Sequence, residues 1–159
     1  MPLDDFDFLE GHFLVRHQRL KERLAGSDEW LTFDMKFWGQ PIMGRAALLD
    51  QMGGRLGDRE LWGLTLRLYD PDRDQWSLYW ADTWQPGLRP PVIGRFKGRV
   101  GEFFGDDEEG GVPVRARFRW SDITADTARW EQAFSVDSGA TWETNWIMEF
   151  ERLSCEVRP

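Results

Sequence analysis

The stretch FSVDSGATWETNWIMEF, residues 134–150, places its largest apolar side chains at positions of one parity after a short polar turn. Side chains alternate between the two faces of a β-strand, so this pattern predicts a strand with one buried face. The Asp137-Ser138-Gly139 segment has glycine where a tight turn needs a positive φ, which predicts a hairpin. The even-numbered residues facing inward would be Trp142, Trp146, Met148 and Phe150.

Pairing Val136 with Ala140 across this turn predicts the register of the hairpin. It sets Phe134 opposite Trp142, Gln132 opposite Thr144 and Trp130 opposite Trp146, all on one face. The other face would carry the polar residues, which are Arg129, Glu131, Ser135, Glu143, Asn145, Glu149 and Glu151. A slip by one residue would turn every side chain to the opposite face.

The same alternation recurs upstream. VPVRARFRW, 112–120, separates Phe118 and Trp120 from three arginines, and LWGLTLRLYD (61–70) with QWSLYWAD (75–82) forms a second hairpin. In that hairpin we expect one shared apolar face made of Leu64, Leu66, Leu68, Trp76, Leu78 and Trp80. Further strands are expected over 12–22, 30–38, 43–52, 92–97 and 100–106, with a short helical turn near 21–28.

These segments predict an all-β fold: a closed antiparallel meander barrel of about ten strands, with at most a short helical turn. Closure fits because each strand has one apolar face, and a closed barrel leaves no edge strand exposed. No repeat or linker interrupts the 159 residues, so 1–159 is expected to be a single domain.

The overall composition narrows the class of partner. A net charge of −8 argues against nucleic acid, because phosphate binding requires a positive surface. The acidic start, MPLDDFDFLEG, has no apolar core of a secretory signal, and no apolar run approaches the ~20 residues of a membrane helix. The single cysteine, Cys155, fits a reducing compartment. We therefore expect a cytoplasmic protein without a membrane or nucleic-acid partner, either a monomer or a homodimer.

The chemistry-bearing motifs are few. His12 and His17 are five positions apart, which places them on opposite faces of a strand, where they cannot converge on one metal ion. Asp70, Asp72 and Asp74 lack the glycine and glutamate that complete a calcium loop. No nucleophile motif or zinc motif occurs. We therefore assign no catalytic residue and no metal ligand.

The barrel interior is the expected site. Large aromatic walls with a few polar groups are typical of pockets for small apolar molecules. The candidate lining residues are Trp62, Trp80, Trp130, Gln132, Trp142, Thr144, Trp146 and His17. Two alternatives stay open: a barrel packed solid by these side chains, with a structural or interaction role, and an enzyme performing acid–base chemistry on an apolar substrate. The second would need an interior titratable group, and Glu102, Asp34 and His17 are the candidates.

Two parts of the chain resemble known barrels. FLEGHF, residues 8–13, is similar to the G-x-W opening of lipocalins and related calycin barrels, with Gly11 matching and Phe13 replacing the tryptophan. In those proteins this aromatic residue packs at the closed end of the barrel near an arginine of the last strand, and Arg152 has the matching parity.

A wider resemblance covers most of the chain. TLRLYDP, QWSLYWAD, PPVIGRF, FRWSDIT and RWEQAFSVDSGATWETNWIMEFER look like a bacterial family of lipocalin-like domains of unknown function. This resemblance implies a calycin-type barrel and supplies neither an activity nor catalytic residues, although similar barrels bind fatty acids or other apolar ligands. One branch of such barrels binds haem through a late histidine, whereas both histidines here lie early, so no haem or other cofactor is expected.

Overall fold

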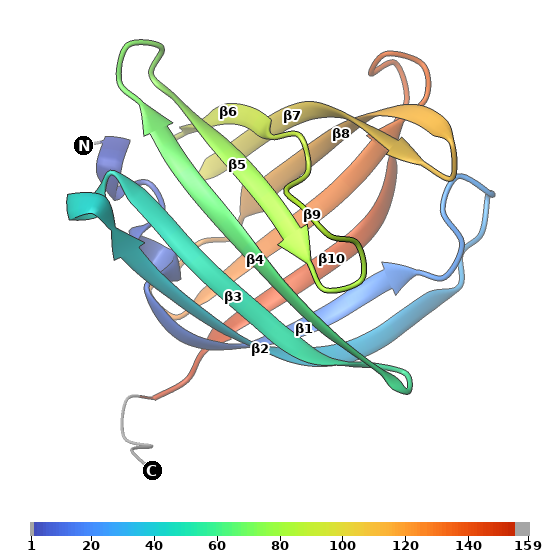
Figure 1. Ribbon diagram of the computed structural model, residues 1–159, viewed down its shortest axis with the longest axis horizontal. Coiled ribbons are helices and arrows are strands. Elements are labelled where there is room, and N and C mark those ends of the chain that lie inside the picture. The colour runs from blue at the N-terminus through green and yellow to red at the C-terminus, as the bar shows by residue number, and fades with distance from the viewer. Residues whose placement is uncertain (1, 155–159) are drawn as a thin grey trace.

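The computed structural model describes residues 2–154. Its ten strands form one antiparallel meander that closes on itself, as Figure 1 shows. The strands are β1 (Gly11–Leu20), β2 (Trp30–Ile42), β3 (Ala47–Leu56), β4 (Arg59–Asp70), β5 (Gln75–Asp82), β6 (Val92–Lys97), β7 (Val100–Glu109), β8 (Val112–Ser121), β9 (Thr127–Ser135) and β10 (Glu143–Arg152). The predicted all-β, closed, ten-stranded fold is confirmed.

Closure occurs between the first and last strands. β1 pairs with β10 from Phe13 opposite Arg152 to Arg19 opposite Trp146, and β1 also pairs with β2. Every strand therefore has neighbours on both sides, and the apolar faces of all ten strands enclose one interior.

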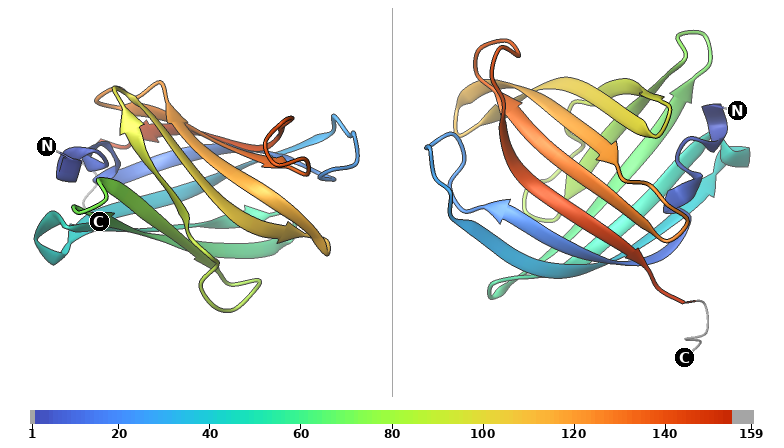
Figure 2. Two further views of the ribbon diagram at one scale, coloured as in Figure 1. Left: turned by 90° about the horizontal axis from the view of Figure 1, so that it is seen from above. Right: turned by 180° about the vertical axis from the view of Figure 1, so that it is seen from behind.

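A short N-terminal segment plugs one end of this barrel, beside the β2–β3 connection (Figures 1 and 2). It consists of the 3₁₀ turns η1 (Pro2–Asp4) and η2 (Asp7–Leu9), and a third 3₁₀ turn, η3 (Met43–Arg45), joins β2 to β3. Phe6 and Leu9 are fully buried. The Phe6 ring lies 5.0 Å from that of Trp76, in an edge-on arrangement that aromatic pairs favour. This end is closed by packing.

The helical turn expected near 21–28 is not present. Residues 21–25 form bends between β1 and β2, and the short helical pieces lie at η1, η2 and η3 instead. Arg23 and Leu24 are held by tertiary contacts: the backbone N–H of Leu24 donates to the Glu143 carboxylate at 2.8 Å. Contacts with β10, formed across the barrel wall, thus decide the conformation of this loop.

The prediction that the leucines of β4 face the barrel interior was wrong. Leu64, Leu66 and Leu68 pair with Ala81, Tyr79 and Ser77 on the outer face, whereas the inner face carries the alternate residues. These inner residues are Leu61, Gly63, Thr65, Arg67 and Tyr69. Both faces of β4 carry apolar side chains, so alternation alone selects no face.

A bulge in β10 changes the predicted hairpin register. Thr144 pairs with Ala133, but Trp146 pairs with Gln132, leaving Asn145 unpaired between them. The extra residue keeps Trp146, Met148 and Phe150 inside and reverses the parity of the residues before it. Asn145 and Glu143, both expected outside, therefore turn inward: Asn145 is fully buried and Glu143 lies opposite Phe134.

Candidate ligand-binding cavity

The barrel encloses a cavity of about 950 Å³. It extends from Trp120 and Phe150, near the plugged end, to the loops at the opposite end. There it is bordered by Arg23 after β1, by Trp84 after β5 and by Gly110 in the β7–β8 turn. The interior is thus hollow toward one end and packed toward the other.

One wall of the cavity is aromatic. Trp130 of β9 and Trp146 of β10 lie with their ring centroids 5.9 Å apart and nearly perpendicular, at 84°. Phe118 of β8 lies 5.0 Å from Trp130. Edge-to-face packing holds these rings in fixed orientations. Because all three residues border the cavity, they offer a rigid apolar surface to a ligand.

The opposite part of the wall carries a buried ion pair. Asp50 of β3 bonds the Arg67 guanidinium of β4, and the two side chains are only 2% and 4% exposed. The Asp50 carboxylate also accepts a hydrogen bond from the backbone N–H of Thr65 at 3.2 Å. Burial raises the pKa of the Asp50 carboxyl, and the neighbouring Arg67 charge opposes that rise. The pair places polar groups at the cavity surface without a net charge.

A second polar group lies on the aromatic wall. The Gln132 side-chain amide donates to the side-chain oxygen Oδ1 of Asn145 at 2.8 Å, and both residues are buried. The β10 bulge creates this contact, because it turns Asn145 toward β9. Gln132 itself borders the cavity.

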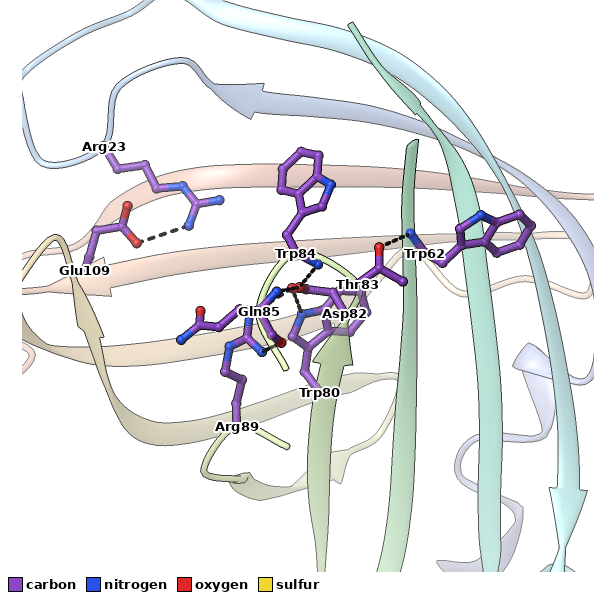
Figure 3. Close-up of polar contacts among 9 residues, drawn as sticks. All are labelled: Arg23, Trp62, Trp80, Asp82, Thr83, Trp84, Gln85, Arg89 and Glu109. Atoms are coloured by element: carbon purple, nitrogen blue, oxygen red, sulfur yellow. Dashed lines mark hydrogen bonds and ion pairs between the residues drawn. The ribbon is translucent and has the colours of Figure 1, made fainter. Parts of the chain in front are cut away.

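The loop after β5 borders the cavity, and Asp82 organises it through the contacts drawn in Figure 3. One Asp82 oxygen accepts from the backbone N–H groups of Trp84 and Gln85, each at 3.0 Å. The other accepts from the Trp80 indole and from Arg89, each at 2.9 Å. A single carboxylate thereby fixes both ends of the loop.

The wall between β5 and β6 ends early on this side. Their pairing runs only from Trp76 opposite Gly94 to Leu78 opposite Val92, so residues 79–82 extend beyond it. The Arg89 N–H bonds the Trp80 carbonyl at 2.8 Å across this interval. A backbone hydrogen bond therefore joins the loop of residues 83–91 to β5 beyond the point where β5 and β6 stop pairing.

Four of the predicted site residues meet at the cavity: Trp80, Trp130, Gln132 and Trp146 all border it. His17 faces inward and is 1% exposed, but it lies behind Trp146, whose indole N–H donates to His17 Nδ1 at 2.9 Å. Burial lowers the pKa of His17 to about 3. His12 is on the outer face, stacked on Trp38, so the two histidines point apart as predicted.

Three predicted lining residues lie elsewhere. Trp62 is on the outer face of β4, 51% exposed, and Figure 3 shows it pointing away from Arg23 and Glu109. Trp142 packs outside against Phe104 and beneath the Arg117 guanidinium, which is 4.7 Å from the centre of its ring. Thr144 pairs with Ala133 on the outward-facing parity. The β4 face and the β10 bulge account for all three corrections.

The three signature residues meet at the plugged end. The Arg152 guanidinium carbon lies 4.5 Å from the centre of the Phe13 ring. Its nitrogens donate to the carbonyl oxygens of Glu10 and Phe8 at 2.6 and 3.2 Å. Gly11 has a φ of 113°, and a Cβ there would lie 2.9 Å from an Arg152 nitrogen. The last strand thus ties the N-terminal plug to the barrel.

Sequence reasoning missed the charged members of the site. Arg19 and Arg23 border the cavity, as do Asp50 and Arg67. Arg19 could have been found, because it shares the parity of His17 on a predicted strand. Arg67 was missed because the sequence pattern assigned the opposite face of β4 to the interior. Nothing local in the sequence signals that Arg23 turns inward, since it lies in a loop.

The alternative candidates for acid–base chemistry do not border this cavity. Glu102 pairs with Arg95 and Arg119 on the outward parity, and Asp34 is exposed on β2. Within residues 2–154, no group of three or more His, Cys, Asp or Glu side chains is arranged to hold a metal ion. In the same range, no helix has the length and apolar character needed to cross a membrane. Cys155 lies outside the described residues.

No family model and no curated protein matches the chain. Functional conclusions therefore rest on the cavity.

Proposed function

We propose that this protein is a lipocalin-like binding protein that holds one small apolar or aromatic molecule inside its barrel, without covalent chemistry. The observation that supports this most is the cavity of about 950 Å³ with an aromatic wall. Cavities that hold cofactors and drug-sized ligands have volumes of about 300–1,000 Å³. A barrel of solid packing would leave no such space, so the cavity favours the binding role over a purely structural one.

The residues suit binding better than catalysis. The buried carboxylate at the cavity, Asp50, already accepts hydrogen bonds from Arg67 and from a backbone N–H, so both of its oxygens are engaged within the protein and not by a substrate proton. The aromatic wall supplies area instead: burying a ligand face against Trp130 and Trp146 removes apolar surface from water, at about 25 cal/mol per Å². Gln132 and the Arg67 group can orient a polar atom.

The first test compares the native and denatured masses of the purified protein. A native mass larger by a few hundred daltons identifies a co-purified molecule, and the same spectrum gives the oligomeric state. The protein is then titrated with phenylnaphthylamine, a neutral dye that fluoresces in apolar surroundings, after any bound molecule has been removed.

Two matched variants locate the dye. Trp130→Ala removes a ring from the cavity wall, whereas Trp62→Ala removes one from the outer face. We expect Trp130→Ala to weaken dye binding about tenfold or more, since an aromatic contact contributes on the order of 1 kcal/mol beyond its buried area. Trp62→Ala should bind as the wild type does. Equal effects of the two variants, with both folded, would contradict the proposal.

A further inference from the structure

Two guanidinium groups face the cavity near its open end. Arg19 of β1 and Arg23 of the following loop both border it. Their guanidinium carbons lie 5.1 and 5.6 Å from the centre of the same ring, that of Trp146. A cation over an aromatic face is attracted to it. Because the ring carries no net charge, this contact does not neutralise the charge of either arginine. Two positive charges therefore gather at one side of the cavity entrance.

Arg23 is buried without full hydrogen bonding. Its side chain is 9% exposed, and its closest carboxylate contact is from Nη1 to Glu109 at 3.5 Å, the long limit of a hydrogen bond (Figure 3). Its Nε and Nη2 atoms have no partner among residues 2–154. Burial and the nearby Arg19 charge lower the pKa of Arg23 to about 10. A buried cation in this state is costly unless an anion pairs with it.

Arg19 lacks an ionic partner too: no carboxylate of the described chain lies within ion-pair distance of it. The other two cavity arginines differ, since Arg67 pairs with Asp50 and Arg89 with Asp82. Within the described chain, Glu109 is the only carboxylate at ion-pair distance from either arginine, and it contacts Arg23 alone. Asp82, Asp106, Asp107 and Glu108 also border the cavity, but none of them forms an ion pair with Arg19 or Arg23.

The remaining unpartnered groups of the cavity wall are donors as well. Arg67 Nε and the Trp120 indole nitrogen are buried without a partner in the described chain, and both residues border the cavity. Neither atom can accept a hydrogen bond. The unpartnered buried side-chain atoms of the described cavity wall are therefore all hydrogen-bond donors, and acceptor atoms of a ligand could pair with them.

We infer that the cavity binds an amphipathic anion, with a carboxylate, sulfonate or phosphate head between Arg19 and Arg23 and an apolar body along Trp130 and Trp146. The inference rests on the proposed binding function and narrows its ligand class. A planar or tetrahedral oxyanion matches the forked guanidinium donors and displaces Glu109 from Arg23. Residues 106–108 at the rim are acidic but exposed, where water and salt screen their repulsion.

Two dyes that differ in one charged group test this. Anilinonaphthalene sulfonate carries a sulfonate that phenylnaphthylamine lacks, and the two share the same aromatic body. The variants are Arg23→Gln and Arg19→Gln, with Arg16→Gln as the control because Arg16 is exposed on the outer face of the same strand. Far-ultraviolet circular dichroism and thermal unfolding confirm that each variant is folded.

We expect each interior variant to weaken sulfonate-dye binding about ten- to a hundredfold, the range for a hydrogen bond to a charged group. Binding of the neutral dye should stay within about twofold, and the control should match the wild type with both dyes. Glu109→Gln should act in the opposite direction and tighten binding of the sulfonate dye alone, because it removes the competing carboxylate. Displacement by decanoate, decyl sulfate and decyl phosphate then ranks the head groups, with decanol as the uncharged reference.

The outcomes separate the two proposals. If the neutral dye binds through Trp130 but the sulfonate dye responds to neither arginine variant, the anion inference is overturned and the binding function stands. If neither dye binds the wild-type cavity, both are overturned. If Arg23→Gln fails to fold, Arg19→Gln and Glu109→Gln still give opposite expected shifts, and equal shifts for the two dyes would refute the inference.

Discussion

The indole N–H of Trp146 donates a hydrogen bond of 2.9 Å to Nδ1 of His17, and both residues are buried inside the barrel. Because Nδ1 accepts, the proton of the neutral imidazole must be on Nε2, so the bond fixes one tautomer. The His17 ring also stacks on Phe33, with the centroids 4.6 Å apart. His17 thus contacts the Trp146 ring, which forms part of the cavity wall.

The burial of His17 makes stability depend on pH. Burial lowers the pKa of His17 from 6.5 to about 3, so between these values the unfolded chain binds a proton that the folded protein does not. His17 therefore stabilises the fold fully above pH 6.5 and loses that contribution as the pH falls. We expect a loss of about 2 kcal/mol from this group between pH 7 and pH 5. His17→Asn, which keeps an acceptor without titrating, should lose correspondingly less, as measured by urea unfolding at both pH values. Equal losses in the two proteins would contradict the assignment.

The buried Asp50–Arg67 pair gives a second prediction. Asp50→Leu leaves the Arg67 charge buried and unpaired, which should cost about 3–5 kcal/mol in the free energy of unfolding. Adding Arg67→Met removes that charge, so the double variant should be more stable than Asp50→Leu alone. Urea unfolding of the two single variants and the double variant measures the coupling. An additive result would mean that the two side chains do not stabilise each other.

Two glycines lie beneath tryptophan rings on opposite faces of the sheet, which allows a matched comparison. A Cβ at Gly63 would lie 2.1 Å from Trp80 inside the barrel, and one at Gly53 would lie 2.2 Å from Trp62 outside. Trp62 is half exposed and can swing into solvent, whereas Trp80 is held by its bond to Asp82. Gly63→Ala should therefore cost about 1–3 kcal/mol and Gly53→Ala less than about 1 kcal/mol. Thermal unfolding compares them, and a larger loss in Gly53→Ala would contradict the assigned faces.

Arg152 is expected to anchor the N-terminal plug. Its three bonds to the carbonyl oxygens of Phe8, Glu10 and Ala125 use the whole guanidinium fork, which a lysine cannot reproduce. Arg152→Lys should lower stability by about 1.5–3 kcal/mol. It should also speed hydrogen exchange at the Leu9 amide, which bonds the Phe6 carbonyl within the plug. Exchange in the β8–β9 strands serves as the internal reference, and an unchanged Leu9 rate would show that the plug is held by Phe6 and Leu9 packing alone.

The bulge at Asn145 gives a final prediction. Asn145→Ala removes the acceptor of the Gln132 amide in a buried setting, so the lost bond should cost about 1–3 kcal/mol. Replacing both residues by apolar ones, as in Asn145→Ala with Gln132→Leu, should recover part of that loss because no polar group is then left unpaired. Urea unfolding measures both. A double variant less stable than Asn145→Ala would show that Gln132 has another role in the wall.

The local alternation of side chains determined most of the fold. In β8 and β9 the even-numbered residues Phe118, Trp120 and Trp130 face inward as expected, since arginines or glutamates occupy the other face of those strands. A charged face and an apolar face leave only one orientation with low free energy, so the period alone assigns the strand. Ten such segments joined by short turns are enough to indicate a closed meander.

Tertiary structure decided what alternation leaves ambiguous. β4 has leucines on its outer face and Arg67 on its inner face, and only pairing with Asp50 explains why a charge is inside. The bulge at Asn145 depends on a partner in β9, and the inward turn of Arg23 depends on contacts with Glu109 and Trp146 from distant strands. These features depend on hydrogen bonds and ion pairs between residues of different strands. A local sequence pattern does not predict such contacts. These contacts place Arg67, Asn145 and Arg23 inside the barrel. The sequence by itself therefore determined the closed meander, and the tertiary structure decided which polar and charged groups face its interior.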